Sequence, residues 1–342
     1  MNGMEIRNVC LCGGGSLSHV VAGWLAREGY GVSVFTRSPE RWDRNLTIHT
    51  PEGGFTVPLK AVSADPAEVI ADADVVLLTV PGYGNRDILT AIKPWLKKGC
   101  FVGGVFCSSG FFFEAMEMLP ETVKLWGFQR VPFISRVDEY GHSAYLLGYR
   151  PEFRIAVERA VEEDKEAFRL WVEKAFGSKT VLLNNYLEAS ITNSNPILHT
   201  ARLYTMFAGE NEGRTWDHNI LFYEEWTLEA AELMMKMDAE LFRILKELPV
   251  SPDYLVPLVE YYEGHDAVSV KDKLSSISGL KGITSPMKQT AGGWVPNFGD
   301  RYFLEDFGFS LRYIYLLARK HGIATPNIDK VYLWGLDKIK SR

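Results

Sequence analysis

The first half of the chain alternates short apolar runs with amphipathic stretches. A strand of a parallel sheet that is covered on both faces reads as a continuous apolar run, so each run predicts a buried strand. The predicted strands are 8–11, 31–35, 75–80 and 100–106. Residues 18–28 predict a helix between the first two strands, and residues 51–54 predict a small hairpin. Strand, helix and strand in this order form a βαβ unit.

The pattern changes near residue 184, where apolar positions begin to recur at spacings of three and four. This spacing is typical of amphipathic helices, and it is most regular over 221–248, where Met and Leu predict a packed core. Asn195 followed by Pro196 predicts an N-cap and a first helical residue. A later helix is expected to begin near Glu305 or Asp306. We therefore predict an α/β domain over 1–183 and an all-α domain over 184–342.

The composition fits two folded domains and restricts the partners. The 342 residues are 46% hydrophobic and 23% charged, and the formal net charge is −6. A single ordinary core does not extend over this length, so two domains are expected. No run of five or six like charges occurs, which argues against a nucleic-acid or membrane surface. The sequence favours small-molecule partners.

The cysteines give no sign of disulfides or metal binding. Cys10, Cys12, Cys100 and Cys107 lie in or beside apolar runs, where reduced, buried thiols are expected and no metal site is predicted. The first residues lead into a predicted strand without the charged head and apolar stretch of a secretory signal, and no apolar run is long enough for a membrane span. We expect a cytoplasmic protein.

A glycine-rich turn follows the first predicted strand. Gly13, Gly15 and Ser18 stand where the dinucleotide fingerprint G-x-G-x-x-G has three glycines, between a strand and a helix. Backbone amides at the start of that helix would face a pyrophosphate. Ser18 departs from the fingerprint but is small enough for close packing. The turn predicts a mostly parallel, doubly wound Rossmann sheet that binds a nicotinamide dinucleotide.

The end of the second strand indicates which dinucleotide is favoured. An acidic residue there would bind the ribose 2′-hydroxyl, whereas Thr36, Arg37, Ser38 and Arg41 offer donors and positive charge to a 2′-phosphate. We therefore expect NADP to be favoured over NAD, unless both arginines are solvated surface cations. The loops after the third and fourth strands should line the nicotinamide pocket. The candidate cofactor-binding residues are Gly13, Gly15, Ser16, Leu17, Ser18, Thr36, Arg37, Ser38, Arg41, Val80 and Pro81.

Two side chains of the second half have both a structural and a chemical interpretation. His199 lies near the start of a predicted helix, where it is either a packed core residue or a base. Asp306 is by itself an ordinary N-cap or first-turn acid. The sequence alone does not choose between these readings.

Several motifs in their order along the chain resemble the octopine/nopaline (opine) dehydrogenase family. These motifs are CGGGSLS, LLTVPG, QRVPFISR, NPILH, FYEEWT and RYFLED, and the likeness extends over nearly the whole length. The resemblance implies a helical domain like the C-terminal domain of 6-phosphogluconate dehydrogenase. It also implies that His199 and Asp306 form a proton-transfer dyad and that Arg301 holds the carboxylate of a keto acid.

Other residues of the second half have open roles. Asn195 and Arg202, with Asn193, are candidate substrate contacts that could instead be caps or surface groups. Trp216, Trp294 and Tyr302 could line a pocket or belong to the core.

The family resemblance implies an enzyme that joins an amino acid to a 2-keto acid and reduces the imine with NAD(P)H. Two alternatives stay open: a 2-keto acid or ketopantoate-type reductase that forms a hydroxy acid, and a non-catalytic NADP-binding protein. The helical domain could also form a homodimer.

Overall fold

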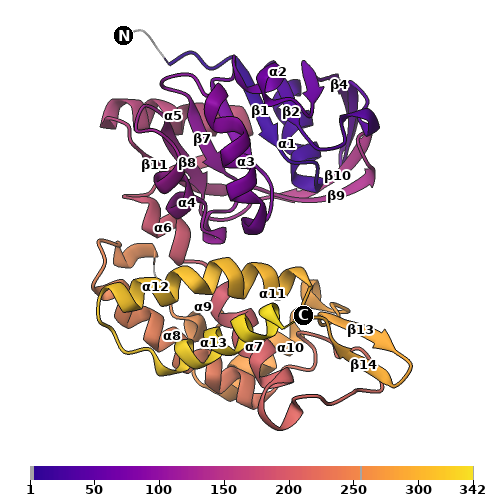
Figure 1. Cartoon of the computed structure of the whole chain (residues 1–342), viewed down its shortest axis with the longest axis vertical. Helices are drawn as coiled ribbons and strands as arrows, with labels where there is room; N and C mark the ends of the chain where they lie inside the picture. The colour runs from indigo at the N-terminus through magenta and orange to yellow at the C-terminus, as the bar shows by residue number, and fades with distance from the viewer. Residues whose placement is uncertain (1–3, 255, 342) are drawn as a thin grey trace. The chain divides into compact units, whose positions relative to one another are not determined.

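The computed structural model describes residues 4–254 and 256–341. The chain divides into two compact units, Met1–Ser190 and Ile191–Arg342. The first unit is built on β-sheets and the second on helices (Figure 1). Each unit is described by itself below.

An eight-stranded sheet forms the centre of the first unit, in the order β12-β11-β8-β7-β6-β1-β2-β5. All neighbouring pairs are parallel except β8 and β11. The order β5-β2-β1-β6-β7-β8 is the doubly wound Rossmann arrangement, which confirms the predicted fold class. Its strands are β1 (Asn8–Cys12), β2 (Gly31–Phe35), β5 (Ala61–Ser63), β6 (Val75–Leu78), β7 (Phe101–Gly104), β8 (Lys124–Phe128), β11 (Glu152–Glu158) and β12 (Lys179–Leu182).

A second sheet of four strands has the order β4-β3-β10-β9. The predicted hairpin at 51–54 is present, because Thr50 pairs with Gly53 across β3 and β4. Helix α1 contacts β3, β9 and β10, so the second sheet packs against the helix that follows the glycine turn. The strands are β3 (Asn45–Thr50), β4 (Gly53–Pro58), β9 (Phe133–Glu139) and β10 (Ser143–Tyr149).

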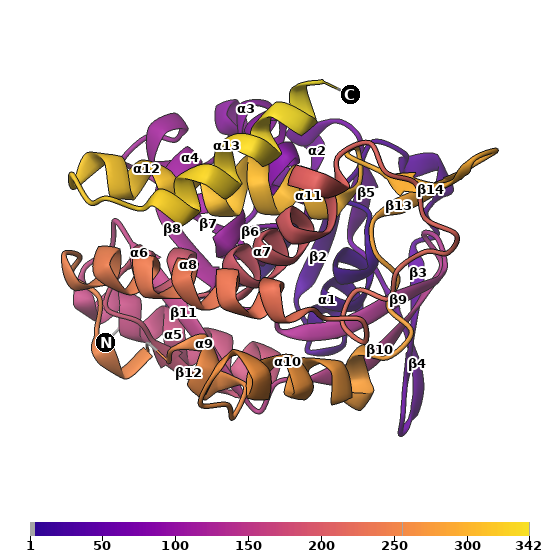
Figure 2. The ribbon, with the colours of Figure 1, turned by 90° about the horizontal axis from the view of Figure 1, so that it is seen from below.

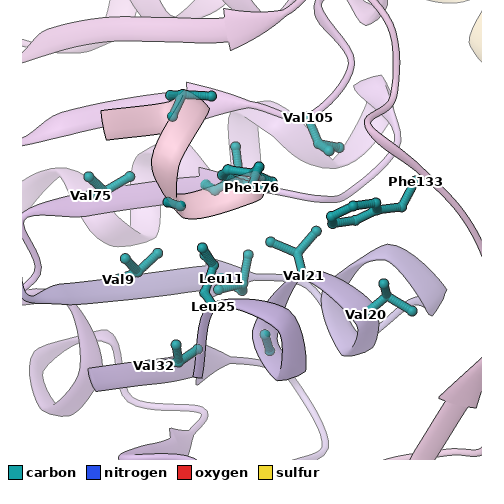
Figure 3. Packing of buried hydrophobic residues seen from close by; sticks show 14 of the residues in the cluster. Val9, Leu11, Val20, Val21, Leu25, Val32, Val75, Val105, Phe133 and Phe176 are labelled. Atoms are coloured by element: carbon teal, nitrogen blue, oxygen red, sulfur yellow. The ribbon is translucent and has the colours of Figure 1, made fainter. Parts of the chain in front are cut away.

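The core of the first unit joins both sheets through α1 (Figure 3). Val9 and Leu11 on β1 contribute to it, and so do Val21 and Leu25 on α1 and Phe176 at the end of α5. Burial of these side chains fixes the helix against the sheet, so the turn between β1 and α1 has a defined position. The helices are α1 (Ser16–Arg27), α2 (Pro66–Ile70), α3 (Asn85–Ile92), α4 (Phe111–Met118), α5 (Glu162–Phe176) and α6 (Tyr186–Ile191).

In the helical unit, α7 and α8 pack against each other and both contact α13 (Figures 1 and 2). Glu240 on α8 is buried and ties α13 in place, because its carboxylate accepts hydrogen bonds from the backbone amides of Asn327 and Ile328 at the start of α13. The helices are α7 (Asn195–Phe207), α8 (Leu228–Lys246), α9 (Leu258–Tyr261), α10 (Ala267–Ser276), α11 (Arg301–Glu305), α12 (Arg312–Lys320) and α13 (Pro326–Lys340).

Two predicted helix starts are wrong in detail. Helix α7 begins at Asn195 with Ser194 before it, so Asn195 is the first helical residue and not the N-cap. Helix α11 begins at Arg301, several residues before the predicted start, because the Asp300 side chain accepts a hydrogen bond from the Tyr302 amide and caps it. Asp306 is therefore not an N-cap but the C-cap residue of α11, and it is the acid in the first turn of the segment that follows. It opens a π-helical segment, Asp306–Leu311, that connects α11 to α12.

The second unit also contains a hairpin that the sequence did not predict. Strands β13 (Met287–Thr290) and β14 (Gly293–Pro296) are antiparallel and pair Thr290 with Gly293. Each strand has only four residues, which is too short to show an alternating pattern in the sequence. None of the helices within 4–254 and 256–341 has the length and apolar character to cross a membrane.

Candidate active site

The turn between β1 and α1 has the geometry that a phosphate-binding loop needs. Gly13 has φ +136°, a conformation that L-residues rarely adopt, and a Cβ there would lie 2.6 Å from Thr79 Oγ1. A Cβ on Gly15 would meet nothing within 4 Å, so the backbone faces open space at the amino end of α1. Unpaired amides at a helix start bind anions, which fits a dinucleotide pyrophosphate.

Ser18 replaces the third glycine of the fingerprint with a hydrogen bond. Its side chain is fully buried, and its hydroxyl bonds Thr79 Oγ1, which in turn donates to the Cys12 carbonyl. The departure from the fingerprint therefore ties α1 to the end of β6. Ser16 Oγ accepts from the Val137 amide of β9, and Leu17 packs against the core.

A histidine that sequence reasoning missed supports the same turn. His19 is completely buried in α1, and its Nδ1 lies 2.8 Å from the Gly15 carbonyl. Its Nε2 accepts a hydrogen bond from the Gly141 amide at 2.7 Å, so Nδ1 carries the proton and donates to Gly15. Burial lowers the pKa of His19, which agrees with a neutral ring.

Tyr140 also reaches the glycine turn from a distant part of the chain. A Cβ on Gly14 would lie 2.3 Å from Tyr140 Oη and 3.1 Å from Thr36 Oγ1, so only glycine fits there. The guanidinium carbon of Arg41 lies 4.3 Å from the centre of the Tyr140 ring. This ring therefore places the Arg41 charge beside the turn. Nothing in the local sequence around Tyr140 indicates this.

The other predicted cofactor residues surround the carboxyl ends of β2 and β6. Thr36 is buried and its amide donates to Ser63, whereas Arg37 is exposed and Ser38 is half-buried. Val80 and Pro81 follow β6 and are half-buried, and Val80 lies against Gly13. The structure thus gathers this set at one edge of the Rossmann sheet, where α/β folds bind ligands.

In the helical unit, the structure brings His199 and Asp306 together. His199 Nδ1 lies 2.9 Å from Asp306 Oδ2, although 107 residues separate them. Both side chains are buried, His199 at 9% and Asp306 at 7% exposure. The two groups come from α7 and the π-helical segment, which pack against each other. An ionised carboxylate only accepts, so this contact places the imidazole proton on Nδ1 and leaves Nε2 as an acceptor.

Two tyrosines complete the surroundings of the imidazole, and sequence reasoning missed the first. Tyr223 Oη lies 2.9 Å from His199 Nε2, and the Tyr302 ring centre lies 4.9 Å from that of the imidazole. Burial raises the pKa of both tyrosines, and the Asp306 charge adds to the shift. Tyr223 belongs to the FYEEWT motif, but no local signal indicates its contact with a residue 24 positions earlier.

Arg202 binds the main chain of the turn that carries Tyr223. Its Nε donates to the Phe222 carbonyl at 3.2 Å and its Nη2 donates to the Glu225 carbonyl at 2.7 Å. The side chain is 2% exposed, and burial lowers the pKa of Arg202 to about 10. These contacts fix the turn.

Arg301 and Asn195 have free polar groups. Arg301 is exposed at the start of α11, and it has no ion-pair or hydrogen-bond partner within 4–254 and 256–341. The Asn195 side chain is half-buried and likewise has no hydrogen-bond partner in that part of the chain. Asn193 is buried and accepts from the Asn195 amide, which organises the start of α7.

The two tryptophans considered above pair with each other through their backbones. Trp216 and Trp294 exchange amide–carbonyl hydrogen bonds of 2.9 and 2.7 Å, and both are half-buried. These hydrogen bonds join the β13–β14 hairpin to the loop segment around Trp216.

Comparison with known proteins finds a different family model for each half of the chain. Residues 182–338 match the family model "NAD/NADP octopine/nopaline dehydrogenase, alpha-helical domain", and residues 9–104 match that of ketopantoate reductase PanE/ApbA. The helical half of this chain thus matches the octopine/nopaline dehydrogenase family. The resemblance seen in the sequence is confirmed, and the chain is an NAD(P)-dependent dehydrogenase of the opine type.

Relatives of the opine dehydrogenase type match along nearly the whole chain. Tauropine dehydrogenase of Arabella iricolor is 28% identical over 95% of this chain and 89% of its own length. Octopine dehydrogenase of Mizuhopecten yessoensis is 26% identical over 97% and 90%. A solved octopine dehydrogenase superposes with a TM-score of 0.84 at 24% identity, covering 97% of this chain and 89% of that one, which shows the same fold.

Proposed function

We propose that this opine-type dehydrogenase joins the amine of an amino acid to the carbonyl of a 2-keto acid and reduces the resulting imine with NADPH. The observation that carries this proposal is the buried His199–Asp306 hydrogen bond in the helical unit. A base held in one tautomer by a carboxylate is what proton exchange at a carbonyl or imine needs. Relatives support the substrate class, since octopine dehydrogenase has been solved with NADH and pyruvate and with NADH and L-arginine.

Each residue of the helical unit has a proposed role in this reaction. Asp306 keeps the proton on His199 Nδ1 and stabilises the imidazolium when Nε2 takes up a proton. The unpaired Arg301 guanidinium would bind the keto-acid carboxylate, bidentate if the geometry allows. Asn195 could contact substrate through its free amide. The two carbonyl contacts of Arg202 favour a positioning role over a direct substrate contact.

The residues of the Rossmann unit fit a dinucleotide and favour NADP. The open backbone at Gly15 and the amino end of α1 would hold the pyrophosphate. Arg41, oriented by the Tyr140 ring, and the exposed Arg37 would bind a ribose 2′-phosphate. A solved yersinopine dehydrogenase with NADP⁺ bound shares the fold, with a TM-score of 0.73 at 14% identity. The bound nicotinamide supplies the hydride.

A ketopantoate-type reductase is the second candidate, favoured by the family match of residues 9–104. Such an enzyme would reduce the keto acid directly to a hydroxy acid and need no amine. The match of residues 182–338 to the octopine/nopaline family favours the opine reaction, because that half carries the proposed dyad. A cytoplasmic location and a homodimer stay predictions.

One experiment separates the two reactions. Purified protein receives NADPH and pyruvate, with and without a mixture of amino acids, and the products are identified by mass spectrometry. We expect NADPH oxidation to depend on the amino acids and a secondary-amine dicarboxylate to form. Oxidation that ignores amines and yields lactate would refute the opine reaction. His199→Ala should lower kcat by at least about 100-fold, and turnover near wild type at saturating substrate would refute the dyad.

A further inference from the structure

Both nitrogens of the His199 imidazole are engaged. Nδ1 contacts Asp306 at 2.9 Å, and Nε2 contacts the Tyr223 hydroxyl at the same distance. With the ring proton on Nδ1, the lone pair of Nε2 accepts a hydrogen bond from Tyr223 O–H. A substrate group therefore exchanges a proton with Nε2 either by displacing the phenolic hydroxyl or through that hydroxyl.

Tyr223 cannot easily move aside, because its turn is fixed from two sides. Arg202 holds the carbonyls of Phe222 and Glu225 at 3.2 and 2.7 Å. The Trp226 ring stacks on Tyr223 with a 16° angle between their planes, and the Trp226 amide donates to the Tyr223 carbonyl at 3.1 Å. Swinging the hydroxyl away from His199 would disrupt this packing and leave Nε2 buried without a partner.

The hydroxyl also has the acid–base behaviour of a relay. Burial raises the pKa of Tyr223 well above its ordinary value of 10, with smaller contributions from Tyr302, Tyr262 and Asp306. A phenolate is therefore not populated near neutral pH. Such a group passes a proton by releasing one and receiving another in the same step.

We propose that Tyr223 is the catalytic residue that carries the proton between His199 and the substrate. This inference rests on the proposed function and names the group that touches the substrate. In the opine reaction the amine adds to the keto acid and gives a carbinolamine, which must lose water before reduction. That loss of water is the step we assign to the relay.

The step balances with the residues present. Tyr223 gives its hydroxyl proton to the carbinolamine oxygen, and the C–O bond breaks with its electron pair to release water. The nitrogen lone pair forms the C=N bond of the iminium. Tyr223 takes a proton from Nε2 of the His199 imidazolium, which becomes neutral while Nδ1 stays bonded to Asp306. Nε2 acquired that proton earlier through the same hydroxyl, when the ammonium group of the amino acid lost it to become the amine that adds to the keto acid. No electrons are gained or lost until the hydride is transferred.

Tyr223→Phe tests the relay because it keeps the ring and removes only the hydroxyl. We expect kcat for opine formation to fall by about 100-fold or more, with the KM for pyruvate within three-fold of wild type. The matched control is Tyr204→Phe. Tyr204 lies on α7, the helix that carries His199, but its ring packs against Trp334 instead of the dyad, so activity should stay within two-fold of wild type.

A primary isotope effect distinguishes lost proton transfer from misfolding. It is the ratio of kcat with ordinary NADPH to kcat with deuterated NADPH, and this ratio does not depend on the fraction of enzyme that is active. With NADPH deuterated at the transferred hydrogen, the isotope effect on kcat should drop towards 1 in Tyr223→Phe, since dehydration becomes slower than hydride transfer. The comparison is made at the pH where the wild-type effect is largest. A merely structural role would lower kcat and leave the isotope effect unchanged.

The outcomes separate the relay from the proposed function. If the wild type needs the amine but Tyr223→Phe keeps a kcat within three-fold of the wild-type value, the relay alone is overturned. The relay alone is also overturned if Tyr223→Phe loses most of its kcat but keeps the wild-type isotope effect. A wild type that makes only the hydroxy acid overturns the opine reaction and, with it, the dehydration step assigned to Tyr223. A wild type that reduces neither substrate overturns both.

Discussion

Asp238 is a buried acidic residue of the helical unit. It lies on α8 with 7% exposure, and its Oδ2 accepts a hydrogen bond from the Leu258 amide. Burial raises its pKa to about 6, and the Leu258 hydrogen bond opposes this only in part. The folded state therefore binds the proton more tightly than the unfolded state, where the pKa is near 3.8. Its ionisation destabilises the fold as the pH rises through 4 to 6.

Asp238→Asn should stabilise the protein at high pH. The amide keeps an acceptor for Leu258 but carries no charge, so we expect a gain in unfolding free energy of about 3 kcal/mol at pH 8 and about half that at pH 5. Urea unfolding at the two pH values measures it. Asp272→Asn is the control, because that side chain is 64% exposed and should change stability by less than about 0.5 kcal/mol. An equal gain in unfolding free energy at pH 5 and pH 8 would contradict the raised pKa of Asp238.

The preference for NADP is a residue-scale prediction about Arg37 and Arg41. Calorimetry with 2′,5′-ADP and 5′-AMP isolates the 2′-phosphate from the rest of the cofactor. We expect wild type to bind 2′,5′-ADP more tightly, and Arg37→Ala and Arg41→Ala each to weaken it about 10-fold with little effect on 5′-AMP. Arg44→Ala, an exposed arginine three positions beyond Arg41, should change neither affinity. If both variants keep the wild-type ratio of the affinities for 2′,5′-ADP and 5′-AMP, these arginines are ordinary surface cations.

The π-helical segment Asp306–Leu311 is the element that aims the dyad carboxylate. A π-turn holds one residue more than an α-turn, and such turns often occur at functional sites. Here the segment starts at Asp306 and packs on α7, which carries His199. Because each residue of an α-helix turns the chain by about 100°, removing the extra residue would rotate Asp306 relative to α12.

Deletion of Gly308 should therefore restore an α-helical register and separate the dyad. We expect kcat to fall by about 100-fold or more while circular dichroism stays helical. Gly308→Ala is the matched control, since a Cβ there meets nothing within 4 Å. It should keep the activity and stabilise the helix by about 0.5–1 kcal/mol. A deletion variant with normal turnover would show that the segment does not position Asp306.

At the scale of the whole molecule, the chain distributes the residues of its proposed chemistry over two units. The glycine turn and the arginines of the cofactor site belong to Met1–Ser190, and the dyad belongs to Ile191–Arg342. The opine relatives match across this division, with 95% or more of the chain aligned in tauropine and octopine dehydrogenases. These relatives therefore extend over both units.

The sequence predicted the elements whose signals are local. A continuous apolar run marks a strand covered on both faces, and Gly13 has a backbone conformation that other residues rarely adopt, so β1, α1 and β2 were predicted within about two residues. The starts of α7 and α11 were misplaced because a cap depends on which side chain accepts the first amides. Several polar residues near each start offered that possibility.

By itself, the sequence determined the order of strands and helices, the glycine turn between β1 and α1, and the family that the motifs resemble. The family resemblance implied that His199 and Asp306 pair. Only the tertiary structure decided that they meet through Nδ1, and only it revealed Tyr223 on Nε2 and Tyr140 beneath Arg41. The physical reason is that hydrophobic periodicity reports which face of an element is buried, whereas a contact between distant residues depends on how the elements pack. The one extra residue of a π-helical turn is enough to change the direction of a carboxylate, and no local sequence pattern predicts such a turn.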